Sequence, residues 1–268
     1  MLGVVQMAAK ASPLETLEEI ALLAEGAKNL GCEAVCFPEC VLTGYAPERA
    51  AERGIFREGA VIGKTSELAK ELQIDLLVGF MERAEGGVYI THGLFRRDGS
   101  REFYRKTHLG KKEARYFTAG NELPVLELSS GIKIGIQLCV ETHFPEITQT
   151  LSLQGAEVIF APYAAPGAGE DRVKIWKKYI PARSYDNRVY VACCNLTGGF
   201  GGGYFIASPE GEILSSGFGE EAHIEVFAVD REGIKSYRTE DGPRHSYYPC
   251  CRRAELYQQG STDWRNGK

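Results

Sequence analysis

The stretch Ile132-Lys133-Ile134-Gly135-Ile136-Gln137-Leu138-Cys139-Val140-Glu141-Thr142-His143-Phe144-Pro145-Glu146 decides the fold, because it predicts a buried strand that leads into a helix. Residues 132–138 are mostly apolar and β-branched, which is typical of a buried strand. An early proline, an acidic residue and a closing Gly155 mark a helix in the segment that follows. Cys139 therefore falls between strand and helix. A thiol near the positive end of a helix favours the thiolate, so we expect a reactive cysteine, although a lone cysteine can also be a small buried hydrophobe.

Two other apolar segments end in residues with complementary chemistry. The segment 35–39 ends in Glu39, and the segment 103–109 contains Lys106 directly after Phe103-Tyr104-Arg105. With Cys139 they supply a base, a cation and a nucleophile, each at the carboxyl end of a predicted strand. Enzymes built on sheets collect their reactive groups at such ends. Taken alone, Glu39 or Lys106 is most simply a solvated charge, and it is the combination that indicates a site.

Four motifs in this order resemble the nitrilase superfamily of carbon–nitrogen hydrolases, and the similarity covers nearly the whole chain. The motifs are Pro38-Glu39 with Leu42-Thr43-Gly44-Tyr45, then Arg105-Lys106-Thr107-His108-Leu109, then Glu113 with Tyr116-Phe117-Thr118-Ala119-Gly120, and Cys139 with Phe144-Pro145-Glu146. The similarity continues past Asn195 to the segment 252–257.

The resemblance implies an α/β fold, a four-layer αββα sandwich of two face-to-face sheets with outer helices. It also implies a cysteine hydrolase in which Glu39 is the general base, Lys106 stabilises the oxyanion and Cys139 is the nucleophile. Glu113 corresponds to the second glutamate of the family, which orients the lysine and the substrate. The predicted substrate-binding residues are Tyr45, Val140, His143 and Tyr163, and no cofactor and no metal are expected.

The predicted substrate is a small amide or an N-carbamoyl compound, with water as the second reactant. A nitrile is the alternative, because the same residues could serve it. Glu141 and His143 depart from the commonest family pattern after the nucleophile, and they flank the expected pocket, which leaves the substrate open. A non-catalytic binding or scaffold protein is a second alternative, although intact Glu39, Lys106 and Cys139 argue against it.

Composition and charge limit the other classes of function. The chain has 268 residues, a formal net charge of −5 and eight cysteines. A mildly acidic protein is a poor partner for nucleic acid or an anionic membrane. No apolar run approaches the roughly 20 residues of a membrane span, and the N-terminus reads as a strand rather than a signal peptide. We therefore expect a cytoplasmic protein with neither nucleic-acid nor membrane partners.

The cysteines do not suggest a disulfide scaffold in a chain of this length. Cys32, Cys36 and Cys40 recur at every fourth residue, but an apolar strand crosses this run and no fourth ligand of suitable spacing follows. A metal or redox protein is therefore a distant alternative. The adjacent pairs at 193–194 and 250–251 are poorly placed to bond each other, and we expect reduced core residues.

Two units of the chain follow the same order of strand, helix, glycine, strand and proline. They span residues 3–38 and 135–162, and either the common grammar of α/β folds or a weak internal repeat explains them. A repeat would imply two related halves whose sheets pack face to face.

The segment 171–187 predicts a helix with a buried stripe. Pro181 should break or kink it, which allows two shorter helices, and Arg183 and Asn187 are expected to hold loops near the site.

Residues 1–268 are predicted to form a single carbon–nitrogen hydrolase domain, with 237–268 as a C-terminal tail. The tail is rich in tyrosine and arginine, and its apolar residues do not recur with the period of a helix or strand. We therefore expect its aromatic residues to pack against another surface. We expect that surface to be a subunit interface in a homodimer or a larger even-numbered homo-oligomer. The alternative is that the tail wraps over its own subunit.

Overall fold

Two six-stranded sheets form the centre of the protein, in a computed structural model that describes residues 1–238 and 248–257. In spatial order the first sheet consists of β12 (His223–Phe227), β1 (Leu2–Gln6), β2 (Ala34–Cys36), β3 (Asp75–Ala84), β4 (Gly87–Phe95) and β5 (Arg101–Arg105). The second consists of β11 (Ile213–Gly217), β10 (Tyr204–Ala207), β9 (Tyr190–Asn195), β8 (Val158–Tyr163), β7 (Lys133–Ile136) and β6 (Leu126–Glu127).

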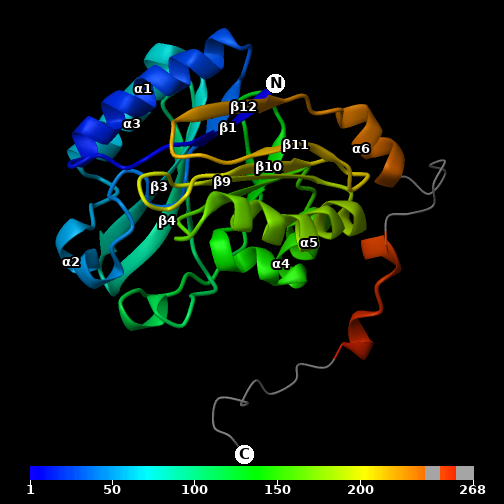
Figure 1. Cartoon of the computed structure of the whole chain (residues 1–268). Coiled ribbons are helices and arrows are strands. Elements are labelled where there is room, and N and C mark those ends of the chain that lie inside the picture. Colours follow the sequence, from blue (N-terminus) through cyan, green and yellow to red (C-terminus); the bar gives the residue numbers. More distant parts are fainter. Residues whose placement is uncertain (239–247, 258–268) are drawn as a thin grey trace, which may run out of the picture.

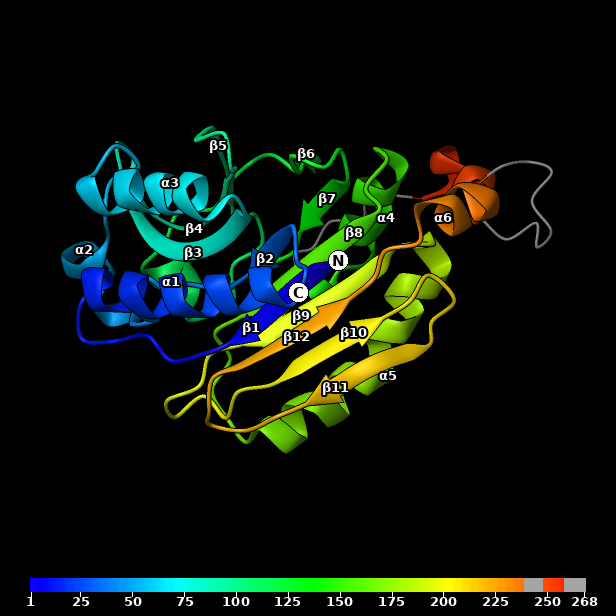
Figure 2. The same cartoon turned by 90° about the horizontal axis from the view of Figure 1, so that it is seen from above.

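Helices cover the outer faces of both sheets, as Figures 1 and 2 show. On the first sheet lie α1 (Pro13–Asn29) and α3 (Ala60–Leu72), with the short α2 (Ala50–Arg53) beside them. On the second lie α4 (Pro145–Leu153) and α5 (Gly169–Asn187), while α6 (Arg231–Arg238) follows β12. Single 3₁₀ turns are η1 (Pro47–Arg49), η2 (Glu113–Arg115), η3 (Cys139–His143), η4 (Tyr248–Cys251) and η5 (Ala254–Leu256).

Three layers of buried apolar side chains hold the four layers together. One cluster joins the inner faces of the two sheets, and it includes Val4 and Leu77 of the first sheet and Ile134 and Phe160 of the second. A second cluster lies under α1 and α3, and a third lies under α4 and α5. The alternation of side chains along each strand explains this division, because neighbouring residues face opposite sides. The predicted αββα sandwich is confirmed.

The two similar units of the sequence occupy equivalent places in the two sheets. In the first, β1 and β2 are parallel and joined by α1; in the second, β7 and β8 are parallel and joined by α4. Local sequence determines where α1 begins. The Ser12 side chain caps the helix by accepting a 3.2 Å hydrogen bond from the Glu15 amide, and Pro13 occupies the first helical position.

The expectation that Pro181 breaks or kinks the segment 171–187 allowed two shorter helices, and the structure has one continuous helix instead. α5 runs without interruption from Gly169 to Asn187, with Pro181 inside it. Its buried face carries Val173, Trp176 and Ile180, which pack under the second sheet. Burying such side chains stabilises the fold by about 1.5–3 kcal/mol each, which offsets the cost of about 3 kcal/mol for an internal proline.

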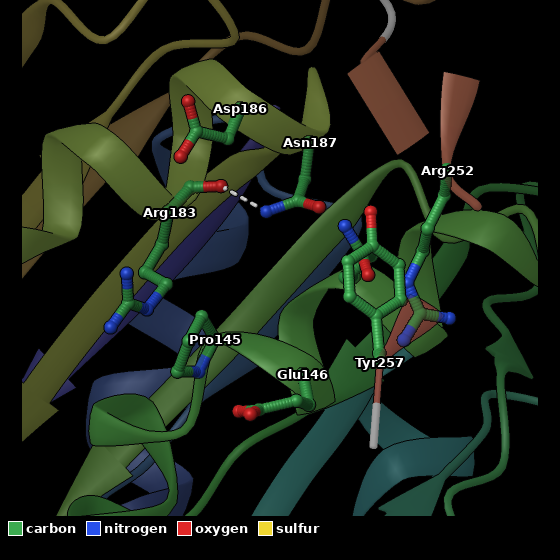
Figure 3. Close-up of a pocket in the computed structure, with 8 residues that line it drawn as sticks. Pro145, Glu146, Arg183, Asp186, Asn187, Arg252 and Tyr257 are labelled. Carbon is green, nitrogen blue, oxygen red and sulfur yellow. Dashed lines mark hydrogen bonds between the residues drawn. The ribbon is translucent and has the colours of Figure 1, made fainter. Parts of the chain in front are cut away.

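The described part of the tail lies on its own subunit. The turn η4 contacts α4 and α5, and a cavity of about 510 Å³ opens between these helices and the tail. Figure 3 shows Glu146, Arg183 and Asp186 on one side of this cavity and Arg252 and Tyr257 on the other.

The cysteine pairs differ in their surroundings. Cys193 and Cys194 are buried, as expected, whereas Cys251 is exposed because it lies on a surface turn, which corrects the prediction for that residue. The side chain of Cys250 and the residues 239–247 and 258–268 lie outside the described part. Within that part, no helix has both the length and the apolar character that a bilayer crossing needs.

Candidate active site

The ends of three strands bring a glutamate, a lysine and a cysteine to one place. Glu39 follows β2, Lys106 follows β5 in the same sheet, and Cys139 follows β7 in the other sheet. The Lys106 Nζ donates hydrogen bonds of 2.8 Å to Oε1 of Glu39 and 2.8 Å to Oε1 of Glu113. Glu39 and Lys106 are each 1% exposed and Glu113 is 5% exposed, so the lysine joins two carboxylates out of contact with bulk water.

Both oxygens of Glu39 have fixed partners. Oε1 accepts the bond from Lys106, and Oε2 accepts a 2.9 Å bond from the backbone amide of Ala164, which follows β8 of the second sheet. The chain turns sharply after Glu39, where Cys40 has a φ of 55°. Gly79 permits this turn, since a Cβ there would lie 2.5 Å from the Cys40 nitrogen and 2.8 Å from the Pro38 oxygen.

Glu113 is held at the start of η2 by two further donors. The Tyr45 hydroxyl donates to Oε1 at 3.1 Å, and the Gly110 amide donates to Oε2 at 2.6 Å. The carboxylate therefore has a fixed orientation toward Lys106. Tyr45, predicted as a substrate contact, supports this carboxylate in the structure.

Cys139 occupies an unusual backbone conformation at the first residue of η3. Its φ is 50°, in the left-handed region that non-glycine residues rarely adopt. Such strain costs on the order of 1–3 kcal/mol and tends to occur at functional sites. A single 3₁₀ turn separates Cys139 from α4, which begins only at Pro145.

The prediction of a thiolate at Cys139 is also corrected by the structure. Burial raises the pKa of the thiol to about 12, and the charge of Glu39 adds to the rise while Lys106 opposes it. The distance along the chain to the start of α4 explains the error, because a helix dipole acts mainly within its first turn. The proton must therefore leave the thiol as it attacks.

Glu39 has the properties of a base for that proton. Burial raises the pKa of its carboxyl group to about 7, with the charge of Lys106 acting in the opposite direction. Burial alone would lower the pKa of Lys106, but Glu39, Cys139 and Glu113 raise it well above its usual value. The lysine is thus a permanent cation beside a carboxylate that can exchange a proton near neutral pH.

Glu141 was expected to flank the pocket, and the structure assigns it to the support of the site. It is completely buried, and its Oε2 accepts a 2.7 Å bond from the amide of Leu138. Its Oε1 accepts bonds from the Tyr104 hydroxyl, from the amide and hydroxyl of Thr107, and from the amide of His108, at 2.6–3.1 Å. One carboxylate thereby ties the loop of Lys106 to the loop of Cys139. The feature of the sequence that could have indicated this supporting role is an acidic residue two positions after the candidate nucleophile.

The remaining predicted substrate contacts lie around Cys139 with different exposures. Val140 is half-buried, and His143 is exposed, with its ring 4.6 Å from that of Tyr179. Tyr163 is 1% exposed and its hydroxyl contacts the Thr142 hydroxyl at 2.5 Å. Substrate binding by these residues stays a prediction.

Arg183 holds the same turn from α5, as expected. Its Nε donates a 3.2 Å hydrogen bond to the Thr142 carbonyl, while the Asn187 amide donates to the Arg183 carbonyl at 2.9 Å. The Oδ1 of Asn187 has no hydrogen-bond partner among the described residues.

The cysteine run 32–40 is divided between two layers. Cys32 packs in the cluster under α1, and Cys36 and Cys40 pack between the sheets. Within residues 1–238 and 248–257, no three histidine, cysteine, aspartate or glutamate side chains are grouped to hold a metal ion.

Comparison with known proteins places the chain in a family. The sequence profile described as carbon-nitrogen hydrolase matches residues 1–239, and the chain belongs to the carbon–nitrogen hydrolase family. An N-carbamoylputrescine amidase of Solanum lycopersicum is 30% identical over 199 residues, which cover 66% of each chain. A hydrolase encoded in the pqqF 5' region of Pseudomonas protegens is 30% identical over 258 residues, covering 92% of this chain and 85% of that protein.

A solved structure agrees with the fold over the full length. The amidase from Nesterenkonia sp. AN1 superimposes with a TM-score of 0.80 at 25% identity, covering 100% of this chain and 99% of the amidase. A variant of that amidase has been solved in complex with butyramide, and it gives a TM-score of 0.79 at 25% identity, with 95% of this chain and 94% of that chain covered. The chain is thus similar to an amidase throughout its two sheets.

Proposed function

We propose that this carbon–nitrogen hydrolase cleaves a small amide or an N-carbamoyl compound through a thioester on Cys139. The observation that carries the proposal is the buried lysine between two carboxylates, one of which is a base with a pKa near neutrality. Buried charges are costly unless they are paired. A lysine and two carboxylates without a role in the site would therefore be expected at the solvated surface, where neither burial nor fixed geometry is needed.

In the proposed acylation, the Cys139 sulfur attacks the carbonyl carbon while Glu39 takes the thiol proton. The carbonyl oxygen gains negative charge, which Lys106 and the Val140 amide stabilise. Glu39 then gives its proton to the leaving nitrogen, and the carbon–nitrogen bond breaks to release ammonia or an amine. The acyl group stays on sulfur as a thioester.

In the proposed deacylation, Glu39 acts as the base a second time. It takes a proton from a water molecule, whose oxygen attacks the thioester carbon. The tetrahedral intermediate collapses, the carbon–sulfur bond breaks, and the sulfur recovers a proton from Glu39. Glu113 keeps Lys106 in place through both steps, supported by the Tyr45 hydroxyl.

The relatives support an amide or carbamoyl group as the substrate. One is an N-carbamoylputrescine amidase, and the similar amidase structure binds butyramide. A nitrile is the alternative, because a relative from Schizosaccharomyces pombe, 26% identical over 225 residues that cover 78% of this chain and 80% of that protein, is described as a probable nitrilase. A non-catalytic scaffold is the alternative from another class, and it predicts no covalent adduct.

Trapping the thioester tests the proposal. The Glu39→Gln variant is mixed with a panel of small amides and N-carbamoyl compounds, and the protein mass is measured together with the mass of the peptide that contains Cys139. We expect an acyl adduct on Cys139 that forms slowly and persists, because losing Glu39 slows the attack of the thiol and also removes the base that activates water for hydrolysis. Cys139→Ala should show neither adduct nor turnover, whereas Cys251→Ala, at an exposed position, should behave as the parent. Full turnover by Cys139→Ala would overturn the mechanism.

We also propose a homodimer, or a larger even-numbered assembly, that uses the outer surface of α4 and α5. This surface is supported by exposed apolar residues at Phe144, Leu153 and Tyr185, with Leu256 and Tyr257 of the tail beside it. Light scattering of the full chain and of a chain ending at Lys235 tests the proposal. A monomeric full chain would overturn it, and a shortened chain that still assembles would remove only the tail from the interface.

A cytoplasmic location stays a prediction.

A further inference from the structure

Arg172 stands beside the candidate site with an unused hydrogen-bond donor. It lies in the first turn of α5, and its side chain is half-buried. Its guanidinium carbon is 5.8 Å from the centre of the Tyr163 ring. Its Nε is buried and has no hydrogen-bond partner among the described residues. An unpartnered buried donor is energetically costly, so a ligand that supplies an acceptor here would recover part of that cost.

The same part of α5 adjoins the nucleophile. Cys139 packs against the cluster that contains Tyr163, Val173 and Trp176. Burial raises the pKa of the Cys139 thiol, and the positive charge of Arg172 is close enough to act in the opposite direction. The guanidinium is therefore a positive charge beside Tyr163, in the cluster that Cys139 packs against.

No carboxylate in the described part of the chain is paired with Arg172. The two acids that precede it, Glu170 and Asp171, both face Lys174, at 2.8 Å and 3.7 Å. Arg183, eleven residues further along the helix, uses its donors on the carbonyls of the turn after Cys139. A structural role comparable to that of Arg183 therefore does not account for Arg172.

The loop that leads to Arg172 is held rigidly, which favours recognition. Its first residue, Ala164, donates to Glu39, and Ala165 exchanges hydrogen bonds of 2.9 Å and 3.1 Å with the Asn195 side chain. The Arg172 amide then donates to the Ala168 carbonyl at 3.1 Å. The backbone that carries Arg172 is thus anchored to the same loop that holds the base.

We propose that Arg172 binds a carboxylate at the far end of the substrate, so that the preferred substrates are amides or N-carbamoyl compounds that carry a negative charge. This inference rests on the proposed function, because it assigns the substrate class of the same site. A guanidinium suits this task because its planar set of donors matches the two oxygens of a carboxylate.

The test compares two amides of the same shape, which are succinamate and 4-methylpentanamide. They differ in a terminal carboxylate and a terminal pair of methyl groups. We expect a kcat/KM for succinamate well above that for the neutral amide in the parent. In Arg172→Gln, the ratio of the two values should fall about 10- to 100-fold, as for the loss of a charge-assisted contact. The fall should come from KM for succinamate, and Arg172→Lys should restore part of it.

The matched control is Lys178→Gln, which removes an exposed positive charge from the same helix and should leave the ratio unchanged. If Arg172→Gln only damages the fold, the kcat/KM values for succinamate and 4-methylpentanamide should fall together. Their ratio would then stay unchanged, which would overturn the inference. A parent that hydrolyses the neutral amide as well as succinamate, or better, overturns it too while the proposed function survives. A chain that cleaves no amide and forms no adduct on Cys139 contradicts the proposed function itself.

Discussion

Replacing Glu141 by glutamine should damage the site without touching a reacting atom. The carboxylate accepts five hydrogen bonds from β5 and two loops, with four at Oε1 and one from the Leu138 amide at Oε2. Glutamine offers one oxygen and one amino group. If its oxygen takes the place of Oε1, its amino group faces the Leu138 amide, and two donors then oppose each other.

The magnitude follows from these contacts. Leaving the buried Leu138 amide without an acceptor costs about 1–3 kcal/mol. The bonds at Oε1 also lose charge assistance, for which about 2 kcal/mol in total is a conservative figure because such bonds are not additive. We expect the free energy of unfolding to fall by about 3–5 kcal/mol, a large part of the 5–15 kcal/mol that is typical of a domain.

Activity should fall with stability, because Lys106 and Cys139 lie on the two loops that Glu141 joins. The stability of the variant is measured by urea unfolding. Its kcat is measured on an amide that the parent cleaves, under conditions in which both proteins are folded. Glu25→Gln is the control, since Glu25 is exposed on α1, four residues before the helix ends, and should shift stability by less than about 0.5 kcal/mol. If Glu141→Gln unfolds at the same urea concentration as the parent and has the same kcat, the assignment of Glu141 as the link between the loops is refuted.

Three further results are expected from the site. Lys106→Met should lower kcat by about 10²–10³, the effect of losing one donor to an oxyanion, and a parent-like kcat would remove the lysine from the mechanism. The kcat/KM of the parent should fall about tenfold per unit below pH 7 and level off above it, because Glu39 works as a base only when ionised and its pKa is about 7; a profile that is flat between pH 5 and 8 would contradict this. Tyr45→Phe, which removes one donor to Glu113, should reduce kcat by less than Lys106→Met does, so an equal loss in both would show that the tyrosine acts directly on substrate.

The strands that end at Glu39, Lys106 and Cys139 were predictable from local pattern, whereas the four layers and the meeting of these residues across two sheets were implied by the family resemblance. Apolar runs with a charged or nucleophilic residue at the end specify strands and strand ends, and parallel strands bring such ends to one edge. The helix over 169–187 was predictable for the same reason, while its continuity through Pro181 was not. The burial of Trp176 decides that point, and burial depends on the sheet below the helix.

The features that sequence reasoning missed depend on contacts between distant segments. Glu141 bonds to Tyr104 and Thr107, which lie 37 and 34 residues away along the chain. The high pKa of the Cys139 thiol arises from burial and from Glu39, which comes from the other sheet. A helix that begins soon after a cysteine suggested the opposite shift, because the pattern contains no information on how deeply the thiol is buried.

The division of the site between the sheets has a consequence for how function is lost. Glu39 and Lys106 belong to the first sheet and Cys139 to the second, and the bonds of Ala164 to Glu39 and of Glu141 to the loop of Lys106 cross between them. The apolar cluster between the sheets holds the two halves at the distance that these bonds require. A change that lets one sheet shift therefore separates the base from the nucleophile before either sheet unfolds. Loss of hydrolysis should for this reason precede loss of secondary structure as urea rises, and coincident transitions would mean that the sheets separate only when they unfold.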